Sequence, residues 1–372
     1  MSVVLEHVGL RDGNDIIIND VSLAFERGTM NVLLGPTLSG KTTLMRLMAG
    51  LDHPTSGRIL VDGKDVAKVP VRRRSVAMVY QQFVNYPSLS VYENIASPLR
   101  VAGIAKAEIE TRVAEAVRVL RLEPFLRRLP AELSGGQQQR TAIARALVKQ
   151  AELVLLDEPL ANLDYKLREE LREELPRLFA ASGAILVYAT TEPSEALLLG
   201  GRTATLWHGR MTQEGPTPSL YRSPGNIDAA RVFSDPPLNE LPIEVRGGSA
   251  SHLDGTPLPE GMVPALADGS YRIGFRVEHA TVVDQAAGYR TTANEAIFAG
   301  TVSVTEISGS ESFVHVDLGF AVWVCLVLGV HDWRPGATAA VAVDPRGIFV
   351  FMPDGSRLQT AVSAAATPAF AG

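Results

Sequence analysis

The chain has 372 residues, enough for two domains, and its content of 46% hydrophobic and 20% charged residues is ordinary for a globular protein with a substantial core. A formal net charge of −6 argues against bulk nucleic-acid binding, although it leaves room for a local basic patch. The single cysteine, Cys325, excludes an intramolecular disulfide and lies in an apolar run that predicts a buried thiol. No signal-peptide pattern and no apolar run near ~20 residues is visible, so we expect a cytoplasmic protein that reaches a membrane only through a partner.

The first thirty residues predict β-structure. Apolar runs at residues 3–5 and 16–18 are candidate strands, separated by a polar turn at residues 11–15. The run Val32-Leu33-Leu34 predicts a buried strand. Apolar residues at helical spacing after residue 41 predict a helix that ends at Gly50.

Between that strand and that helix lies a phosphate-loop motif. The pattern is Gly, four residues, then Gly-Lys-Ser/Thr, here Gly35-Pro36-Thr37-Leu38-Ser39-Gly40-Lys41-Thr42, with Thr43 after it. The glycines allow the backbone to wind around phosphate oxygens, and the helix N-terminus adds positive potential. Lys41 is expected to reach the β- and γ-phosphates of a nucleoside triphosphate, and Thr42 to supply a hydroxyl to Mg²⁺. A glycine-rich turn without function is the alternative, but the strand–loop–helix context favours nucleotide binding.

The next part of the chain predicts alternating strands and helices. Strands are expected at residues 58–61 and 76–80, the second ending at Gln81, and the pattern is helical from about residue 92 to 149. A strand is also expected at residues 184–188. Before it, leucines at helical spacing predict a helix that Pro176 should kink or shorten.

Two acids end a continuous apolar run at residues 153–158. Such a run is typical of a parallel strand buried on both faces. Asp157 is expected near the Mg²⁺ bound to Thr42, and Glu158 is positioned to polarise an attacking water.

A second anion-binding motif, Leu133-Ser134-Gly135-Gly136-Gln137, precedes that run. Serine and two glycines at a helix start make a cradle of N–H groups. One nucleotide does not need two cradles from the same chain, so a second copy or a paralogue is expected to use this one.

With these motifs, residues 3–235 resemble the nucleotide-binding subunits of ATP-binding cassette (ABC) transporters. The resemblance implies an α/β fold, with a P-loop ATPase domain at residues 1–235 that has a mixed sheet core and a helical subdomain at about residues 88–150. It also implies a head-to-tail dimer with ATP and Mg²⁺ as ligands. Each ATP would lie between residues 35–43 of one subunit and Ser134, Gly135, Gly136 and Gln137 of the other.

Further motifs of the family can be placed on this chain. Gln81 matches the glutamine that senses Mg²⁺ and the γ-phosphate, and would join Thr42 and Asp157 at the metal. The stretch from Phe83 to Glu93 matches the region that grips the membrane subunits. The segment Ala161-Asn162-Leu163-Asp164 matches the loop that touches the opposite active site.

Two positions depart from the family's pattern. Thr191 occupies the place of a histidine after the strand at 184–188, and Asp12 falls where an aromatic residue stacks on adenine. A lost transition-state donor costs ~10²–10³-fold in rate, and a lost stack roughly 0.5–1.5 kcal/mol. Tolerated drift is one interpretation. Our hypothesis is that this chain's own site hydrolyses ATP slowly or not at all and completes a competent site on a different ATPase subunit.

Composition changes around Asp235, where proline and glycine become frequent and short alternating strands begin. We expect residues 240–372 to form a separate small all-β barrel with a loose tail of about a dozen residues. Segments 275–279, 306–311 and 341–355 resemble the OB-like (TOBE) accessory domain of ATPases that serve sugar-type importers. His279 and Glu278 lack clustered ligands, so they are interpreted as structural polar residues.

The resemblance implies an ATPase subunit, on the cytoplasmic face of the cell membrane, of an importer for a carbohydrate, polyol or glycerol-phosphate type solute. Its implied partners are a second ABC ATPase subunit, two transmembrane permease subunits and, indirectly, an external solute-binding protein. One rival hypothesis is a pseudo-ATPase scaffold. Another is a soluble cassette ATPase acting on nucleic acid or ribosomes, but those proteins usually carry two cassettes or a long coiled coil, and neither pattern is present.

Overall fold

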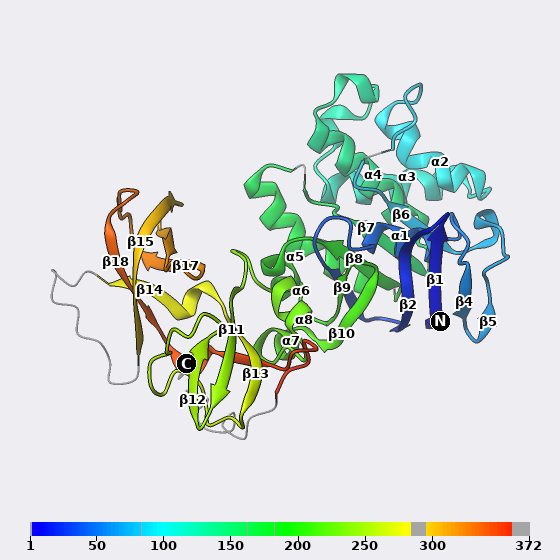
Figure 1. Cartoon of the computed structure of the whole chain (residues 1–372). Helices are drawn as coiled ribbons and strands as arrows, with labels where there is room; N and C mark the ends of the chain where they lie inside the picture. Colours follow the sequence, from blue (N-terminus) through cyan, green and yellow to red (C-terminus); the bar gives the residue numbers. More distant parts are fainter. Residues whose placement is uncertain (1, 83, 162, 182, 284–294, 359–372) are drawn as a thin grey trace, which may run out of the picture. The chain divides into compact units, whose positions relative to one another are not determined.

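The computed structural model describes residues 2–82, 84–161, 163–181, 183–283 and 295–358 (Figure 1). The chain divides into two compact units, Met1–Arg222 and Ser223–Gly372. Residues 223–235, which the sequence analysis places in the first domain, belong to the second unit in this division. Among the described residues, no helix is long and apolar enough to cross a membrane.

An antiparallel sheet opens the first unit. Its strand order is β2-β1-β4-β5, with β1 at Ser2–Asp12, β2 at Asp15–Glu26, β4 at Ser56–Val61 and β5 at Lys64–Asp65. The predicted strands at residues 3–5, 16–18 and 58–61 are confirmed, and the first two are longer than predicted. Alternate residues of β2 are buried, which gives the sheet one apolar face.

A second, mixed sheet forms the centre of this unit. Its order is β10-β9-β3-β8-β7-β6, with β3 at Met30–Leu34, β6 at Val76–Val79, β7 at Leu153–Asp157, β8 at Ile185–Thr190, β9 at Arg202–Trp207 and β10 at Arg210–Pro216. All pairs are parallel except β9–β10. Every residue of β7 and β8 is buried, as predicted for parallel strands covered on both faces.

Parallel pairing explains why distant motifs meet. The carboxyl ends of β3, β6, β7 and β8 lie at one edge of the sheet, and the loops that follow them carry the phosphate loop, Gln81, Glu158 and Thr191.

Helices cover this sheet and extend from it (Figure 1). They are α1 at Lys41–Ala49, α2 at Val91–Val101, α3 at Lys106–Val119, α4 at Gly135–Lys149, α5 at Tyr165–Ala181, α6 at Pro193–Leu199 and α7 at Thr217–Arg222. Short 3₁₀ turns lie at Val71–Arg73, Glu123–Phe125 and Pro130–Glu132. The helical pattern predicted between residues 92 and 149 is confirmed by α2, α3 and α4. Helix α5 continues past Pro176, so the proline does not shorten it.

The second unit is built mainly of antiparallel strands. One sheet has the order β12-β11-β13-β19 and the other β14-β18-β15-β16-β17. The strands are β11 at Asn239–Arg246, β12 at Ser249–His252, β13 at Gly269–Phe275, β14 at Ala280–Val283, β15 at Ala296–Ile307, β16 at Glu311–Asp317, β17 at Val322–Leu328, β18 at Thr338–Val343 and β19 at Phe349–Phe351. Helix α8 at Ile227–Val232 and 3₁₀ turns at Val277–His279 and Pro345–Gly347 complete it. The predicted all-β C-terminal region is confirmed, and the predicted tail at residues 359–372 lies outside the described residues.

One apolar core joins strands from both sheets of this unit. Trp323 and Cys325 are fully buried in it, and burial raises the pKa of the Cys325 thiol to about 12. The predicted core thiol is therefore confirmed, and it stays protonated at neutral pH.

Candidate functional site

The phosphate loop has the backbone that its glycines predict. Gly40 has φ +103° and is the N-cap residue of α1. At Gly35, a Cβ would lie 2.4 Å from the Leu206 carbonyl oxygen and 2.6 Å from the Ser39 hydroxyl, so only glycine fits there. Leu38 points outward and is 94% exposed. The loop is therefore a tight backbone cradle from which the Leu38 side chain is turned away.

Lys41 lies across this cradle and is only 5% exposed. Its Nζ donates hydrogen bonds to the carbonyl oxygens of Gly35 (2.8 Å) and Pro36 (3.0 Å) and lies 3.9 Å from a Glu158 carboxylate oxygen. Burial lowers the pKa of Lys41, and the nearby carboxylates of Glu158 and Asp157 oppose that shift. The ammonium is thus held at the mouth of the loop, where negative charge would stabilise it.

Thr42, Asp157, Glu158 and Gln81 converge at the ends of β6 and β7. The Thr42 hydroxyl donates to an Asp157 carboxylate oxygen at 2.7 Å, and the Gln81 amide donates to Glu158 at 2.8 Å. Burial raises the pKa of both Asp157 and Glu158, and Lys41 lowers each in part. The structure brings these predicted residues together although 115 residues separate Thr42 from Asp157.

These groups fit a magnesium-bound triphosphate. The Ser39 hydroxyl is buried beside the loop and has no hydrogen-bond partner among the described residues, so a buried polar atom stands unsatisfied there. Hydroxyl and carboxylate oxygens, as on Thr42 and Asp157, are the ligands that Mg²⁺ prefers. The cradle of residues 35–43, with Lys41 across it, suits phosphate oxygens.

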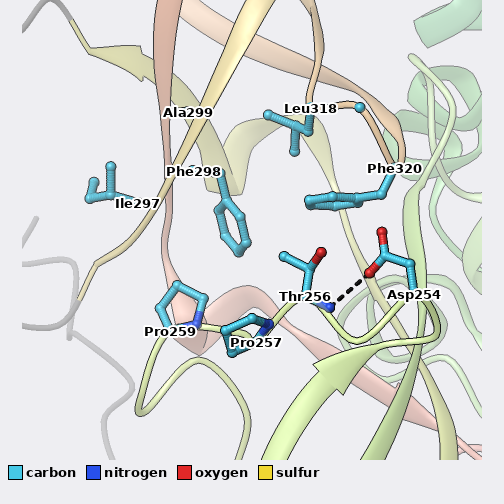
Figure 2. Close-up of a pocket in the computed structure, with 10 residues that line it drawn as sticks. Asp254, Thr256, Pro257, Pro259, Ile297, Phe298, Ala299, Leu318 and Phe320 are labelled. Carbon is cyan, nitrogen blue, oxygen red and sulfur yellow. Dashed lines mark hydrogen bonds between the residues drawn. The ribbon is translucent and has the colours of Figure 1, made fainter.

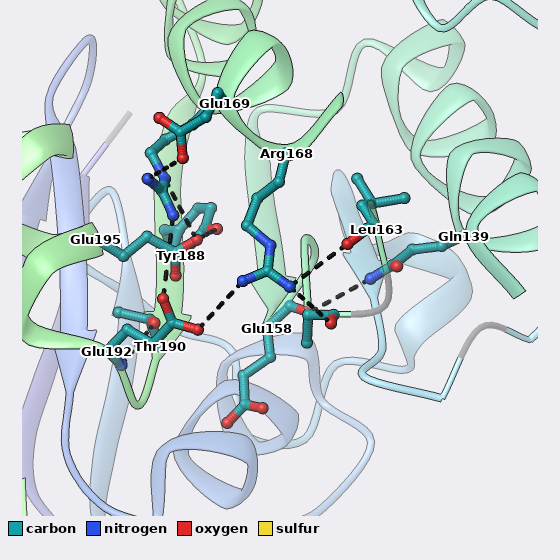
Figure 3. A network of polar contacts seen from close by, with 11 residues as sticks. Gln139, Glu158, Leu163, Arg168, Glu169, Tyr188, Thr190, Glu192 and Glu195 are labelled. Carbon is teal, nitrogen blue, oxygen red and sulfur yellow. Dashed lines mark hydrogen bonds and ion pairs between the residues drawn. The ribbon is translucent and has the colours of Figure 1, made fainter. Parts of the chain in front are cut away.

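Glu158 is held in an unusual backbone conformation. Its φ is +45°, which is uncommon for a residue other than glycine, and its N–H donates to the Ala189 carbonyl oxygen at 3.0 Å. The Gln139 side chain donates to the Glu158 carbonyl oxygen at 3.4 Å, as Figure 3 shows. Neighbours on β8 and α4 thus fix the direction in which the carboxylate points.

Arg168 joins the loop after β7 to the segment after β8 (Figure 3). Its guanidinium donates to the carbonyl oxygens of Ala161 (3.2 Å) and Leu163 (3.4 Å), and lies 3.6 Å from the Glu192 carboxylate. Arg172, one turn later on α5, also approaches Glu192, at 4.0 Å. The segment that follows Thr191 is therefore tied to α5 by two arginines.

Arg172 also belongs to a buried network with Tyr188 and Glu195. The Tyr188 hydroxyl donates to Glu195 at 2.8 Å, and Arg172 lies 3.8 Å from the same carboxylate. Burial, followed by the charge of Glu195, raises the pKa of Tyr188, which keeps the phenol protonated and donating.

Sequence reasoning missed Gln139, Arg168 and Glu192. For Arg168 the sequence offered only its position, one helical turn after the predicted Asp164. Asp164 caps α5 by accepting the Leu167 N–H at 3.0 Å.

The two divergent positions lie in different elements, and Asp12 belongs to the end of β1 rather than to the predicted turn at residues 11–15. Thr191 is half-buried directly after β8, and the carbonyl oxygen of the preceding Thr190 accepts the Gly35 N–H at 3.3 Å. Asp12 is exposed at the last position of β1, opposite Asp15.

The motif around Ser134 lies at the start of α4. Ser134 and Gln137 form a capping box, with the Gln137 side chain accepting the Ser134 N–H at 3.0 Å. Ser134 and Gly135 are exposed. Of the segment 161–164, Asn162 lies outside the described residues.

The stretch predicted to grip membrane subunits borders a groove of about 590 Å³. Tyr86 lines it, with the Arg145 guanidinium 5.1 Å from the centre of the Tyr86 ring. The charged side chains in the described lining are Arg72, Arg74, Arg145 and Lys149, all cations. Phe83 lies outside the described residues.

Comparisons with known proteins agree with this geometry. Residues 18–161 match the family model described as ABC transporter. The chain is 34% identical to the maltose/maltodextrin import ATP-binding protein MalK of Yersinia pestis, over 95% of this chain and 96% of the relative. It is 35% identical to the sn-glycerol-3-phosphate import ATP-binding protein UgpC 1 of Rhizobium johnstonii, over 93% of both chains.

Other similarities cover less of the chain. The Fe(3+) ions import ATP-binding protein FbpC of Agrobacterium fabrum is 43% identical over 66% of this chain and 69% of the relative. Among solved structures, a dimeric ATP-binding cassette in a post-hydrolysis state, bound to ADP and phosphate, has a TM-score of 0.53 and 31% identity. That match covers 58% of this chain and 98% of the cassette.

Proposed function

We propose that this chain powers an importer for a carbohydrate, polyol or glycerol-phosphate type solute. The premise is that the chain belongs to the ATP-binding subunits of ABC transporters. The observation that carries the proposal is the cluster at the sheet edge. There Lys41 and Thr42 meet Asp157, Glu158 and Gln81 within hydrogen-bond or ion-pair distance.

The residues divide the work of ATP hydrolysis among them. The N–H groups of residues 35–43 and the Lys41 ammonium hold the β- and γ-phosphates, while Thr42, Asp157 and Gln81 would hold Mg²⁺, which neutralises phosphate charge when bound. Glu158 orients the attacking water toward the γ-phosphate and accepts a proton from that water. Gln81 donates a hydrogen bond to Glu158. A change at the γ-phosphate can therefore be transmitted through Gln81 to the segment that follows Gln81.

A second chain completes the site in this proposal. Ser134, Gly135, Gly136 and Gln137 are presented at the exposed N-terminus of α4, where N–H groups and the helix dipole favour an anion. The exposure of Ser134 and Gly135 supports use in trans, and one solved relative is dimeric.

The partner is proposed to be a different ATPase chain. Thr191 is uncharged and shorter than histidine, and Asp12 offers adenine no ring, so the chain's own site is weakened while its Ser134 motif is intact. This observation also favours a second candidate, a subunit that binds ATP but never hydrolyses it.

The share of the chain that aligns with each relative favours a sugar-type or glycerol-phosphate solute over iron. The similarity to the maltose and glycerol-phosphate relatives extends through the second unit, whereas the iron-import relative aligns over 66% of the chain. The solute itself does not touch this subunit.

The basic groove of about 590 Å³ is the proposed seat of a permease helix. Three of its cations are fixed by carbonyl oxygens: Arg74 donates to Val69 and Met48, Lys149 to Val76, and Arg145 to Val84. A permease helix with carboxylate side chains on the turn that enters the groove would complement these positive charges. The subunit would thus sit on the cytoplasmic face of the cell membrane without crossing it.

The test is reconstitution of the chain with its permeases and candidate ATPase partners in liposomes. Uptake of maltose, glycerol, sn-glycerol 3-phosphate and Fe³⁺ is measured with wild type and with Lys41→Ala. We expect uptake of one of the first three, lost in the variant. Unchanged uptake with Lys41→Ala contradicts the proposal, and Fe³⁺ uptake contradicts the solute class.

Single-turnover assays separate the two candidates for the chain's own site. Thr191→His in the assembled complex is expected to raise hydrolysis at this site by ~10²–10³-fold, because a transition-state donor is restored. No gain, with ATP still bound and no product formed, favours the non-hydrolysing scaffold. Ordinary turnover by a purified homodimer contradicts the asymmetric pair.

A further inference from the structure

A cavity of about 400 Å³ lies in the second unit, far in sequence from the nucleotide motifs (Figure 2). The loop after β12 contributes Asp254, Thr256, Pro257 and Pro259 to its wall. Strand β15 and the β16–β17 turn contribute the rest of the lining. A volume of this size suits a small molecule.

Aromatic rings form one side of the cavity. Figure 2 shows the rings of Phe298 and Phe320 across the space from Thr256 and Pro257. Their centroids are 6.3 Å apart, and Phe298 packs edge-on against the fully buried Trp323 at 4.9 Å. His252 lies against Phe320 at 5.1 Å. These contacts fix the rings as a rigid apolar wall.

The opposite side carries one fixed negative charge. The Asp254 carboxylate accepts the Thr256 N–H at 2.8 Å and lies 3.0 Å from His252 Nδ1. The hydrogen bonds from Thr256 lower the pKa of Asp254 to about 2, so it is ionised at any physiological pH. Its side chain is 49% exposed, which leaves part of the carboxylate accessible.

The wall offers few hydrogen-bond donors. Pro257 and Pro259 have no N–H, and the N–H groups of Thr256, Leu318 and Gly319 already donate to Asp254, Ala321 and Asp317. An anion would meet a carboxylate without compensating donors, and a polyol would find acceptors but few donors. A cation with an apolar shell satisfies both walls, because aromatic faces attract cations and the carboxylate pairs with their charge.

We infer that this cavity binds a small organic ammonium ion, held between the rings of Phe298 and Phe320 and the carboxylate of Asp254. This binding site is separate from the proposed transport function, and its test does not depend on ATP.

The test is isothermal titration calorimetry of the full-length protein with tetramethylammonium chloride, at ionic strength held constant with sodium chloride. Glycerol and sodium acetate are titrated in parallel. We expect saturable binding of tetramethylammonium alone. Absence of saturable tetramethylammonium binding, or glycerol binding of equal affinity, overturns the inference.

Variants locate the binding. Asp254→Asn is expected to weaken tetramethylammonium at least about fivefold and Phe320→Leu about two- to fivefold, since cation–π contacts at exposed sites contribute ~0.5–1 kcal/mol. Asp268→Asn is the matched control, because that exposed carboxylate accepts the Gly247 N–H at 2.8 Å outside the cavity. Far-ultraviolet circular dichroism verifies that each variant is folded. An equal loss with Asp268→Asn, or no loss with both cavity variants, overturns the assignment.

Discussion

At the scale of single residues, Glu158 shows how the site is preorganised. A positive φ of 45° costs free energy at a residue other than glycine, and it persists because Ala189 and Gln139 bond the backbone on both sides. Gln81 then meets the carboxylate itself. The strain is stored where the carboxylate must point at a reacting group, which supports the catalytic role that we propose.

Replacing Glu158 with glutamine tests that role. The amide keeps the shape of the side chain but cannot take a proton from water, so we expect hydrolysis to fall ~10²–10⁴-fold while ATP affinity stays nearly unchanged. Single-turnover hydrolysis and equilibrium ATP binding are measured in the assembled complex. A rate within twofold of wild type would remove Glu158 from the mechanism.

The pH dependence of the wild-type rate follows from the same residue. Burial raises the pKa of Glu158, and a proton acceptor works only when ionised. Activity should therefore decline as the pH falls through this raised pKa, at a higher pH than for an exposed glutamate. Rates at saturating ATP between pH 5 and 8 are compared with ATP affinity over the same range. A rate flat to pH 5 contradicts the expectation.

Arg168 provides a test of positioning rather than chemistry. Arg168→Ala removes the bridge between the carbonyl oxygens of Ala161 and Leu163 and the Glu192 carboxylate, so we expect kcat to fall about tenfold with KM for ATP changed less than twofold. Arg177→Ala, an exposed position on the same helix, is the control.

A double-mutant cycle identifies the partner of Arg168. Glu192→Gln combined with Arg168→Ala should show a coupling of about 0.5–1 kcal/mol in the transition-state free energy. Additive effects would mean that the ion pair has no part in the positioning.

At the scale of elements, the glycines of β4 and its turn separate two costs of a side chain. Gly57 has φ +78° and lies opposite the irregular pairing between Glu6 and Gly9, where a Cβ would be 2.2 Å from the His7 carbonyl oxygen. Gly63 has nearly the same φ, +76°, but its Cβ would meet nothing within 4 Å. The pair holds backbone strain constant and varies crowding alone.

Gly57→Ala should therefore destabilise the protein more than Gly63→Ala. Both variants bear the conformational cost of about 1–2 kcal/mol, and Gly57→Ala adds a further ~1–3 kcal/mol of overpacking. Urea denaturation followed by circular dichroism measures the difference. Equal midpoints would show that β1 yields to the added methyl group without cost.

Local patterns explain which elements could be predicted from sequence. The phosphate loop, the strand ending at Asp157 and the capped start of α4 are each specified by a few neighbouring residues. The bridge through Arg168 was missed because its partners come from two loops and its role appears only after β7 and β8 pair. Likewise, nothing near Gly57 in sequence indicates that the His7 carbonyl approaches it. Contacts that depend on strand register lie beyond single-segment patterns.

At the scale of the whole molecule, the two units have separate hydrophobic cores. In the first unit, leucines of β7 and methionines of α1 pack with β1 and β2, whereas the second unit is organised around Trp323 and Phe275. The change of composition near Asp235 predicted a second domain, because alternating strands and frequent turns cannot continue an α/β pattern. Its cavity at Asp254 could not be predicted, since three separate segments must fold together to form it.

Separate cores lead to different responses to ligands in a thermal scan of the full chain. The proposed nucleotide site lies in the first unit, so Mg²⁺ and ATP at 100 times the dissociation constant should stabilise that unit by about 2.7 kcal/mol and raise its midpoint by roughly 5–10 °C. The unfolding midpoint of the second unit, which contains Trp323, should shift much less. Lys41→Ala abolishes the nucleotide effect, and an equal shift of both units in calorimetry would show that they unfold as one. Because tetramethylammonium is expected to act on the second unit alone, titrating both ligands on one sample distinguishes a failure of either assignment from the other.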